Sequence, residues 1–249
     1  MQDILVSPHR LQHRSEVQAN GLLAVMPTDT LQRLLPDMEK VRLVGGEVLY
    51  DAGAELRHAY FPIDAIVALL LHTGQGSTTQ VAAIGHEGLA GVSVFLGGIA
   101  HSSAKVLNTG YAFKIPAATL KAEFDRNGAT MRLLLRFTQA VVTQMAQTSV
   151  CNRHHQLEHQ LCSWLLVCMD RLPYGRSLKV TQETVAGMLG VRREGVTEAT
   201  GKLRQLGLIG GSRGEIRLLS RGGLQARACE CYQVVKNETR RLLPDRPAT

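Results

Sequence analysis

The sequence contains no apolar run that approaches the roughly 20 residues a helix needs to span a bilayer, so membrane insertion is not expected. It also lacks a Walker-type loop, a nucleophile elbow and a His-Glu metal motif, which argues against an enzyme. Residues 1–16 lack the apolar core of a signal peptide, and the five cysteines are an odd number. We therefore expect a cytoplasmic protein with reduced thiols.

Positive charge is concentrated in the last third of the chain. The 249 residues have a formal net charge of +7. Residues 1–172 contain 14 Lys+Arg and 14 Asp+Glu, whereas residues 173–249 contain 14 and 7, so the whole excess lies in the second segment. This distribution predicts a basic module, suited to an anionic partner, joined to a neutral one.

The pattern of apolar runs and turn residues changes twice along the sequence. From Val41 to Ile115, short β-branched or aliphatic runs alternate with glycine turns, which predicts a β-sandwich or roll. Turn residues then vanish between Gly128 and Pro173, which predicts a long helical stretch with a hinge near residues 152–155. We expect one domain over residues 1–152, ending in a helix from about 129 to 152, and a second over residues 153–249.

Seven residues of that helix recur at alternating spacings of three and four. Such a heptad pattern is typical of two helices that supercoil along each other, and it predicts a parallel homodimer. The alternative is a helix that lies on the core of its own domain. The expected interface residues are Met131, Leu134, Thr138, Val141, Met145, Thr148 and Asn152.

The second domain contains the pattern of a helix-turn-helix. Thr181 is a suitable N-cap for a first helix, Glu183 suits its first turn, and Gly190 ends it. A second helix begins near Arg192, and its apolar residues predict one inward face. That face consists of Val196, Ala199, Leu203 and Leu206.

The opposite face of the second helix is polar, as required for insertion into the DNA major groove. Arginine can bond guanine O6 and N7 together, and glutamate can accept from cytosine N4. The stretch "LIGGSRGEIRLL" then predicts a hairpin wing with Arg213 at its tip. A helical domain that binds another protein is the alternative. The predicted DNA-binding residues are Thr181, Arg192, Arg193, Glu194, Thr197, Glu198, Arg204 and Arg213.

Residues 180–209 and the wing resemble the winged helix-turn-helix of the Crp/Fnr family of bacterial transcription regulators. "GGEVLYDAGAELRHAYFPIDAIVALL" is similar to the opening strands of that family's cyclic-nucleotide-binding-like β-roll. The resemblance implies an α+β fold with an N-terminal β-roll, or jelly roll, a long dimerisation helix and a C-terminal winged helix-turn-helix. It also implies that the protein is a homodimer that binds a near-palindrome in double-stranded DNA and has RNA polymerase as a further partner.

The resemblance gives individual residues expected roles. Arg193 and Glu194 occupy the positions that contact a G·C pair, and Arg192 and Thr181 those that contact the DNA backbone. Glu198 replaces a frequent second arginine, and its charge would repel phosphates and change the half-site. Arg192 replaces the usual hydroxyl cap of the recognition helix, so its phosphate contact would come at a cost in helix stability.

The same comparison predicts that the β-roll does not bind cyclic AMP in the usual way. Ser102 occupies the position of the arginine that pairs with the cyclic phosphate, and the ribose-binding glutamate is replaced by Val92 or Ser93. His86 and Glu87, with Ser102 and Ser103, form a candidate pocket for a different effector. A constitutive DNA-binding regulator with a vestigial sensor is the alternative.

The cysteines predict neither a cofactor nor a metal site. No cysteine precedes Cys151, so the iron–sulfur cluster of the family's oxygen sensors is not expected. Cys151, His155, His159 and Cys162 would share one face of a continuous helix, yet ligands strung along three turns cannot converge on one ion. Cys229 and Cys231 would point about 200° apart on a helix, which favours packed thiols. The remaining alternative is a metal site made by a bend at the hinge or shared across a dimer.

Overall fold

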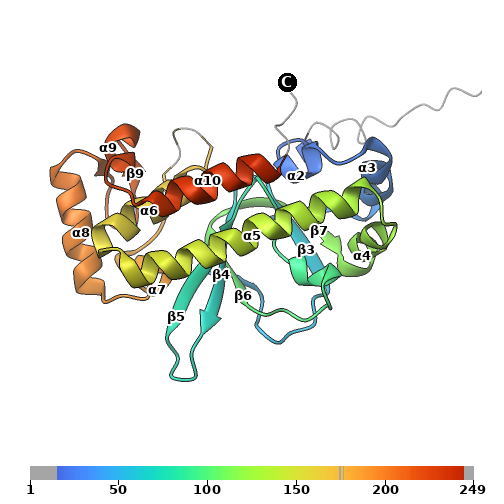
Figure 1. Ribbon diagram of the computed structural model, residues 1–249, viewed down its shortest axis with the longest axis horizontal. Coiled ribbons are helices and arrows are strands. Elements are labelled where there is room, and N and C mark those ends of the chain that lie inside the picture. Colours follow the sequence, from blue (N-terminus) through green and yellow to red (C-terminus); the bar gives the residue numbers. More distant parts are fainter. Residues whose placement is uncertain (1–15, 174, 176, 244–249) are drawn as a thin grey trace, which may run out of the picture.

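The computed structural model describes residues 16–173, 175 and 177–243. The predicted α+β architecture is confirmed: a β-roll, a long helix and a winged helix-turn-helix follow one another along the chain (Figure 1). The segment compared with signal peptides lies almost wholly outside the described residues. Within the described part of the chain, no helix is long and apolar enough to cross a membrane.

The β-roll consists of two antiparallel sheets. The first has the strand order β1-β7-β3, and the second has the order β2-β6-β4-β5. Glycine turns separate the short strands, as the sequence pattern predicts. The strands are β1 (Glu39–Leu43), β2 (Val48–Tyr50), β3 (His58–Pro62), β4 (Ile66–His72), β5 (Thr78–Ile84), β6 (Ser103–Asn108) and β7 (Gly110–Pro116).

Strand β4 is buried on both faces because its side chains alternate between two hydrophobic cores. Val67 and Leu69 lie in the core of the β-roll. Ile66 and Leu70 lie in a second core, which is shared with the helix-turn-helix domain. The two halves of the chain therefore pack directly on opposite faces of one strand.

Short helices close the β-roll at the end away from the helix-turn-helix domain (Figure 1). An ion pair ties two of them together: Arg33 Nε lies 2.7 Å from Oε1 of the buried Glu123. The short elements are α2 (Gly21–Ala24), α3 (Thr28–Leu34), η1 (Leu35–Asp37), η2 (Val92–Phe95) and α4 (Ala117–Asp125).

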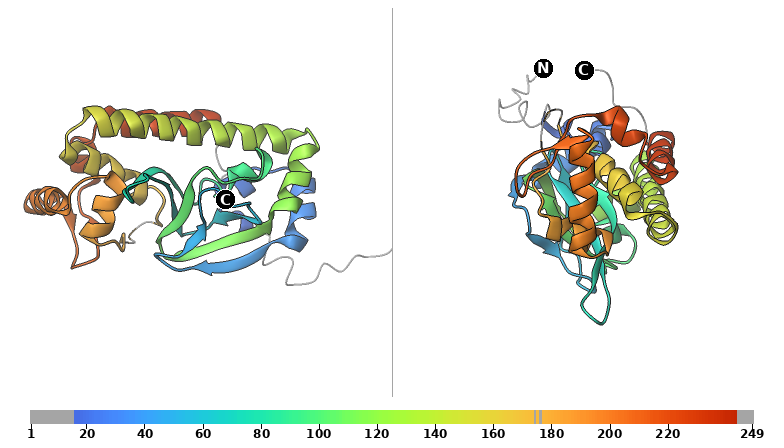
Figure 2. Two further views of the ribbon diagram at one scale, coloured as in Figure 1. Left: turned by 90° about the horizontal axis from the view of Figure 1, so that it is seen from below. Right: turned by 90° about the vertical axis from the view of Figure 1, so that its left-hand side faces the viewer.

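The long helix α5 (Ala129–His154) lies across the β-roll, and α10 (Glu230–Leu242) runs beside it (Figure 2). Phe137 packs so closely on the turn after β5 that a Cβ added at Gly88 would come within 2.0 Å of its ring. A residue with a side chain would therefore not fit at position 88 unless Phe137 moved. The β-roll and α5 are therefore in tight contact.

This contact corrects part of the predicted dimer seam. Leu134 and Val141 are only 0% and 4% exposed, since both belong to the core of the β-roll. The hydroxyls of Thr138 and Thr148 donate to backbone carbonyls one turn earlier in α5. A heptad pattern marks any face of a helix that is packed, and Leu134 and Val141 are packed within the chain.

The chain breaks direction between α5 and α6 (Leu157–Met169), at His155 and Gln156. The helix-turn-helix domain follows on the left of Figure 1. Its remaining elements are α7 (Gln182–Leu189), α8 (Arg193–Gln205), β8 (Ile209–Gly210), β9 (Arg217–Leu218) and α9 (Arg221–Gln225).

Candidate nucleic-acid interface

Helix α7 and the turn after it form as the sequence predicts. The Thr181 hydroxyl caps the helix by accepting from the backbone N–H of Thr184 at 3.0 Å. Gly190 ends it in the left-handed region, with φ of 67°, and the N–H of Val191 then donates to Ala186 O at 3.0 Å. Glycine adopts this conformation without the cost that a Cβ would bring. The turn sets the angle at which α8 begins.

Helix α8 has one buried face and one exposed face. Val196, Ala199 and Leu203 are buried in the core shared with α6 and α7, as predicted. Leu206 is 45% exposed, so its inward placement is wrong. The helix ends at Gln205, and the 3.6-residue period does not continue past its end.

The exposed face of α8 displays polar side chains from its first two turns. Arg192 is the N-cap residue and makes no side-chain capping bond, in line with the expected cost of replacing a hydroxyl. Of the other predicted residues on α8, Arg193, Glu194, Thr197 and Glu198 are exposed, whereas Arg204 is half-buried. A single helix face thus presents cationic, anionic and neutral hydrogen-bonding groups together.

Two residues of this face contact α7. Arg193 Nε lies 3.9 Å from Glu183 Oε2, and both side chains are largely exposed, so the attraction between them is weak. The Thr197 hydroxyl donates to Gln182 Oε1 at 2.8 Å. Arg193 is therefore only weakly held by α7, while the Thr197 hydroxyl is held in place.

A groove of about 680 Å³ lies between α7, α8 and the wing. Thr181, Arg193 and Arg204 line it from the helices, and Arg213 lines it from the wing tip. Arg204 Nε is buried and has no hydrogen-bond acceptor within the described part of the chain. A buried guanidinium N–H without an acceptor is costly, and an incoming phosphate would satisfy it.

An ion-pair network holds α8 against α6. Glu158 on α6 bonds Lys202 on α8, and Arg227 Nη1 donates to Glu158 Oε1 at 2.8 Å. Hydrogen bonds from Lys202 and then from Arg227 lower the pKa of the Glu158 carboxyl. The orientation of α8 therefore depends on a charged carboxylate.

The structure does not bring the four candidate effector residues into one pocket. Ser103 pairs with Leu70 near one end of β4, and its hydroxyl accepts from Ala52 N at 3.0 Å. His86 and Glu87 follow β5 beyond the other end, where Val67 pairs with Ile84. Three residues of strand separate these positions, which is about 10 Å.

Glu87 forms an ion pair with Arg171 and does not face Ser102 or Ser103. Its Oε1 lies 2.8 Å from Arg171 Nε, and Arg171 is 8% exposed. His86 and Glu87 line a groove with α6 and α10 rather than with Ser102 and Ser103. The turn after β5 thus joins the β-roll to the second domain.

The structure contradicts the expectation that Cys229 and Cys231 lie on one helix and point apart. Cys229 is the N-cap of α10 and has an extended backbone, so a helical angle does not separate the two side chains. Both are buried beside Cys151. A hydrogen bond from Cys151, and a weaker effect of Ser163, lower the pKa of the Cys229 thiol against the opposing effect of burial. In contrast, burial raises the pKa of Cys162 to about 12.

Comparisons with known proteins agree with this architecture. Residues 159–227 match the model of the Crp-like helix-turn-helix domain. The structure of FixK2 from Bradyrhizobium japonicum is 14% identical in sequence, with a TM-score of 0.67 over 77% of this chain and 98% of that one. No curated protein sequence matches this chain.

Two further structures show the same fold. A CRP-family transcriptional regulator from Thermus thermophilus is 18% identical, with a TM-score of 0.63 over 76% of this chain and 96% of that one. The c-di-GMP-responsive regulator CLP of Xanthomonas campestris is 14% identical, with a TM-score of 0.59 over 78% and 100%. The predicted resemblance to the Crp/Fnr regulators is confirmed in fold and in helix-turn-helix type.

Proposed function

We propose that this chain, which has the Crp/Fnr fold and a Crp-like helix-turn-helix domain, is a homodimeric transcription regulator that binds a specific DNA sequence through α8. The exposed polar face of α8 is the observation that supports this function best. Arg193 and Glu194 would contact a G·C pair in the major groove, and Arg192 would contact phosphate. RNA polymerase would be a further partner.

The groove beside α8 suits the DNA backbone. Arg204 would donate its unpartnered Nε–H to a phosphate, and Arg213 would follow the adjacent strand from the wing. Thr181 would donate its hydroxyl at the start of α7. Glu198 is exposed on the same helix and would repel phosphates, so we expect the preferred half-site to differ from that of regulators with arginine there.

A dimer of this protein would use the solvent-facing side of α5 and not Leu134 and Val141, which are buried in the core of the β-roll. Leu135, Val142 and Val150 are 41%, 50% and 45% exposed. Their spacings of seven and eight residues place them along one face of the helix. Exposed aliphatic residues on one helix face are typical of an interface. Met131 and Asn152 would lie at the edges of this face.

Oligomeric state tests the dimer. Val142→Asp introduces a charge into the proposed interface, and the variant should sediment as a monomer where the parent protein is a dimer. Leu96→Asp is the matched control, since Leu96 is 51% exposed in the β-roll, and this variant should remain dimeric. A parent protein that sediments as a monomer would contradict the proposed arrangement.

DNA binding is tested by selection from a random pool of duplexes. The expected result is a near-palindrome with half-site centres about 34 Å apart. Arg193→Ala should then lose discrimination at one base pair of each half-site. Arg57→Ala removes the same charge from an exposed position in the β-roll and should leave discrimination unchanged. Equal affinity for selected and scrambled DNA would refute sequence-specific binding.

The same selection tests whether an effector regulates DNA binding. Repeating the selection with candidate ligands distinguishes a regulated protein from a constitutive one. If no ligand changes the affinity for the selected site, the β-roll is a vestigial sensor that serves mainly as a platform for α5.

A further inference from the structure

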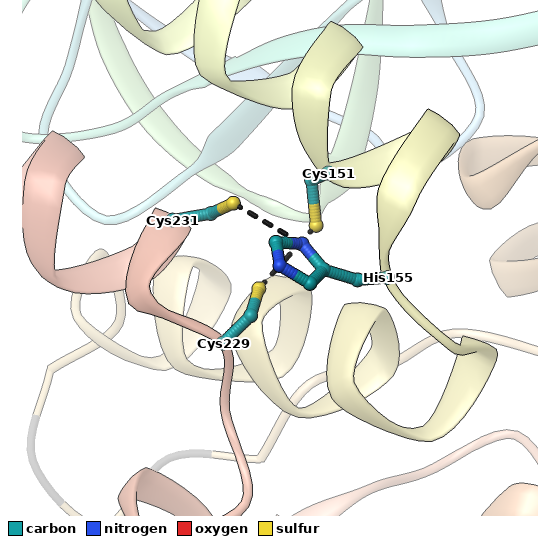
Figure 3. Close-up of side chains that lie close together, drawn as sticks. All are labelled: Cys151, His155, Cys229 and Cys231. Carbon is teal, nitrogen blue, oxygen red and sulfur yellow. Dashed lines mark hydrogen bonds between the residues drawn. The ribbon is translucent and has the colours of Figure 1, made fainter.

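Four potential metal ligands meet where α5 ends and α10 begins. Cys151 lies in the last turn of α5, His155 is the C-cap of that helix, Cys229 is the N-cap of α10, and Cys231 lies in its first turn. Figure 3 shows their side chains pointing toward one another. One ligand atom from each residue lies within 4.8 Å of the ligand atoms of the other three. We call these four residues the Cys/His site.

Two distances within the Cys/His site are close to those around a single tetrahedral ion. Cys151 Sγ lies 3.5 Å from Cys229 Sγ, and Cys231 Sγ lies 3.4 Å from His155 Nδ1. Zinc bonds of about 2.3 Å to sulfur and 2.0 Å to nitrogen would set neighbouring ligand atoms about 3.5 to 3.8 Å apart. All five cysteines are free thiols, so no disulfide competes for these sulfur atoms.

Neighbouring groups orient the ligands in the way that metal sites require. His155 Nε2 lies 3.3 Å from Glu230 Oε1, which leaves Nδ1 to face the sulfur atoms. Ser163 Oγ lies 3.1 Å from Cys229 Sγ and accepts from the backbone N–H of Cys229. Gln147 Nε2 donates to Cys231 Sγ at 3.2 Å. Each ligand other than Cys151 thus has an outer partner.

The helix ends explain how ligands from one helix can converge. The backbone of His155 is extended, with φ of −104° and ψ of 150°, so its imidazole leaves the face of α5 and turns toward Cys151. Cys229 is extended in the same way before α10. The three cysteines are buried, and His155 is 17% exposed. Such a closed set of four protein ligands is typical of a structural site.

We propose that Cys151, His155, Cys229 and Cys231 bind one Zn²⁺ ion, which fastens the start of α10 to the end of α5. Three thiolates and one imidazole are ligands that zinc prefers. An iron–sulfur cluster would hold its ligand sulfur atoms farther apart, because several atoms lie between them. The site is independent of the DNA-contacting residues, so its test does not depend on the proposed function.

Metal analysis of the full chain is the first test. The protein is purified without a histidine tag under reducing conditions, and its zinc is measured by inductively coupled plasma mass spectrometry. The expected content is one zinc per protomer. Replacement by Co²⁺ should give the visible bands of tetrahedral cobalt with thiolate-to-metal charge transfer. Metal-free protein that takes up no Co²⁺, or iron with acid-labile sulfide, would overturn the proposal.

Matched cysteine variants test the ligand set. Cys229→Ser and Cys231→Ser should lose the zinc, whereas Cys162→Ser and Cys168→Ser should keep it, because those two buried thiols lie outside the site. Circular dichroism checks that each variant folds. If a ligand variant does not fold, the cobalt spectrum of the parent protein decides whether the metal has tetrahedral thiolate coordination. Equal zinc loss in the control variants, or a Cys151–Cys229 disulfide in place of metal, contradicts the site.

Ser163→Ala tests the positioning of Cys229. Removing the hydroxyl that contacts the sulfur should weaken zinc affinity by about 10- to 100-fold while leaving the four ligands in place. Ser163→Thr is the conservative variant, because it keeps the hydroxyl, and it should restore part of the affinity. Competition with a chromophoric chelator measures the change. Unchanged affinity in Ser163→Ala would show that this hydroxyl does not position the ligand.

Discussion

Helix α8 takes its exposed polar residues from one stretch of 13 residues, whereas the Cys/His site joins Cys151 to Cys229 across 78 residues of sequence. The first is an amphipathic pattern whose period alone sorts buried from exposed side chains. The second exists only because α10 returns along α5 and begins beside its end (Figure 2). One region is determined locally, and the other by tertiary packing.

This difference has a functional consequence. The residues of α8 that we propose to contact DNA bases keep their relative positions as long as α8 is folded. In the proposed dimer, the position of α8 relative to the second copy would depend on everything between α5 and α8, including the Cys/His site. Base preference and affinity for a paired site should therefore respond to different substitutions.

The largest expected effect is a loss of stability, and it tests whether the sequence period of α8 sorts its buried side chains from its exposed ones. Leu203→Ala leaves a cavity in the core beneath the helix and should lower the free energy of unfolding by about 2 to 5 kcal/mol. Leu206→Ala removes the same atoms from a 45% exposed position and should change it by less than about 0.5 kcal/mol. Urea unfolding measures both. Equal losses would mean that α8 continues past Gln205.

Removal of the metal should separate affinity from base preference. A chelator should weaken binding to the selected paired site by roughly tenfold, about 1.4 kcal/mol, because α10 no longer holds the junction of α5 and α6. The preferred bases should not change. Fluorescence anisotropy with substituted probes checks this, and Cys162→Ser serves as the reference protein. A changed base preference would show that the Cys/His site also shapes α8.

Glu198→Ala should strengthen DNA binding, in contrast to removal of the metal, and the change should be smaller. Loss of a negative charge near phosphates should raise affinity for all duplexes by about two- to fivefold, and more strongly at low salt. Glu55→Ala removes the same charge from an exposed position in the β-roll and should have no effect. A gain restricted to one DNA sequence would instead assign Glu198 to a base contact.

A last prediction concerns the attachment of α8 to α6. Glu158→Gln should cost on the order of 1 kcal/mol at neutral pH, because Lys202 and Arg227 lose an ionised partner. The pKa of Glu158 is lowered in the folded state. Its contribution is therefore present above the unfolded pKa of about 4.3 and is lost as pH falls through the folded pKa. The two proteins should converge in stability in acid, and a constant difference would contradict this.

The sequence patterns predicted the fold to a large extent, since glycine turns, helical periods and caps are local features. They placed the N-cap at Thr181, the turn at Gly190 and the buried residues of α8 up to Leu203. They misplaced Leu206, because a period does not show where a helix ends. They also assigned Leu134 and Val141 to a dimer, because a heptad does not show which surface covers it.

The sequence by itself determined that the second domain is basic and that one face of α8 is polar. It also showed that no cysteine precedes Cys151. Tertiary structure decided that His86 and Glu87 lie apart from Ser103, because strand register sets which residues are neighbours. It also decided the Cys/His site. A helical spacing rule applies only inside a helix, and His155 and Cys229 lie at helix ends with extended backbones, where packing alone directs the side chains.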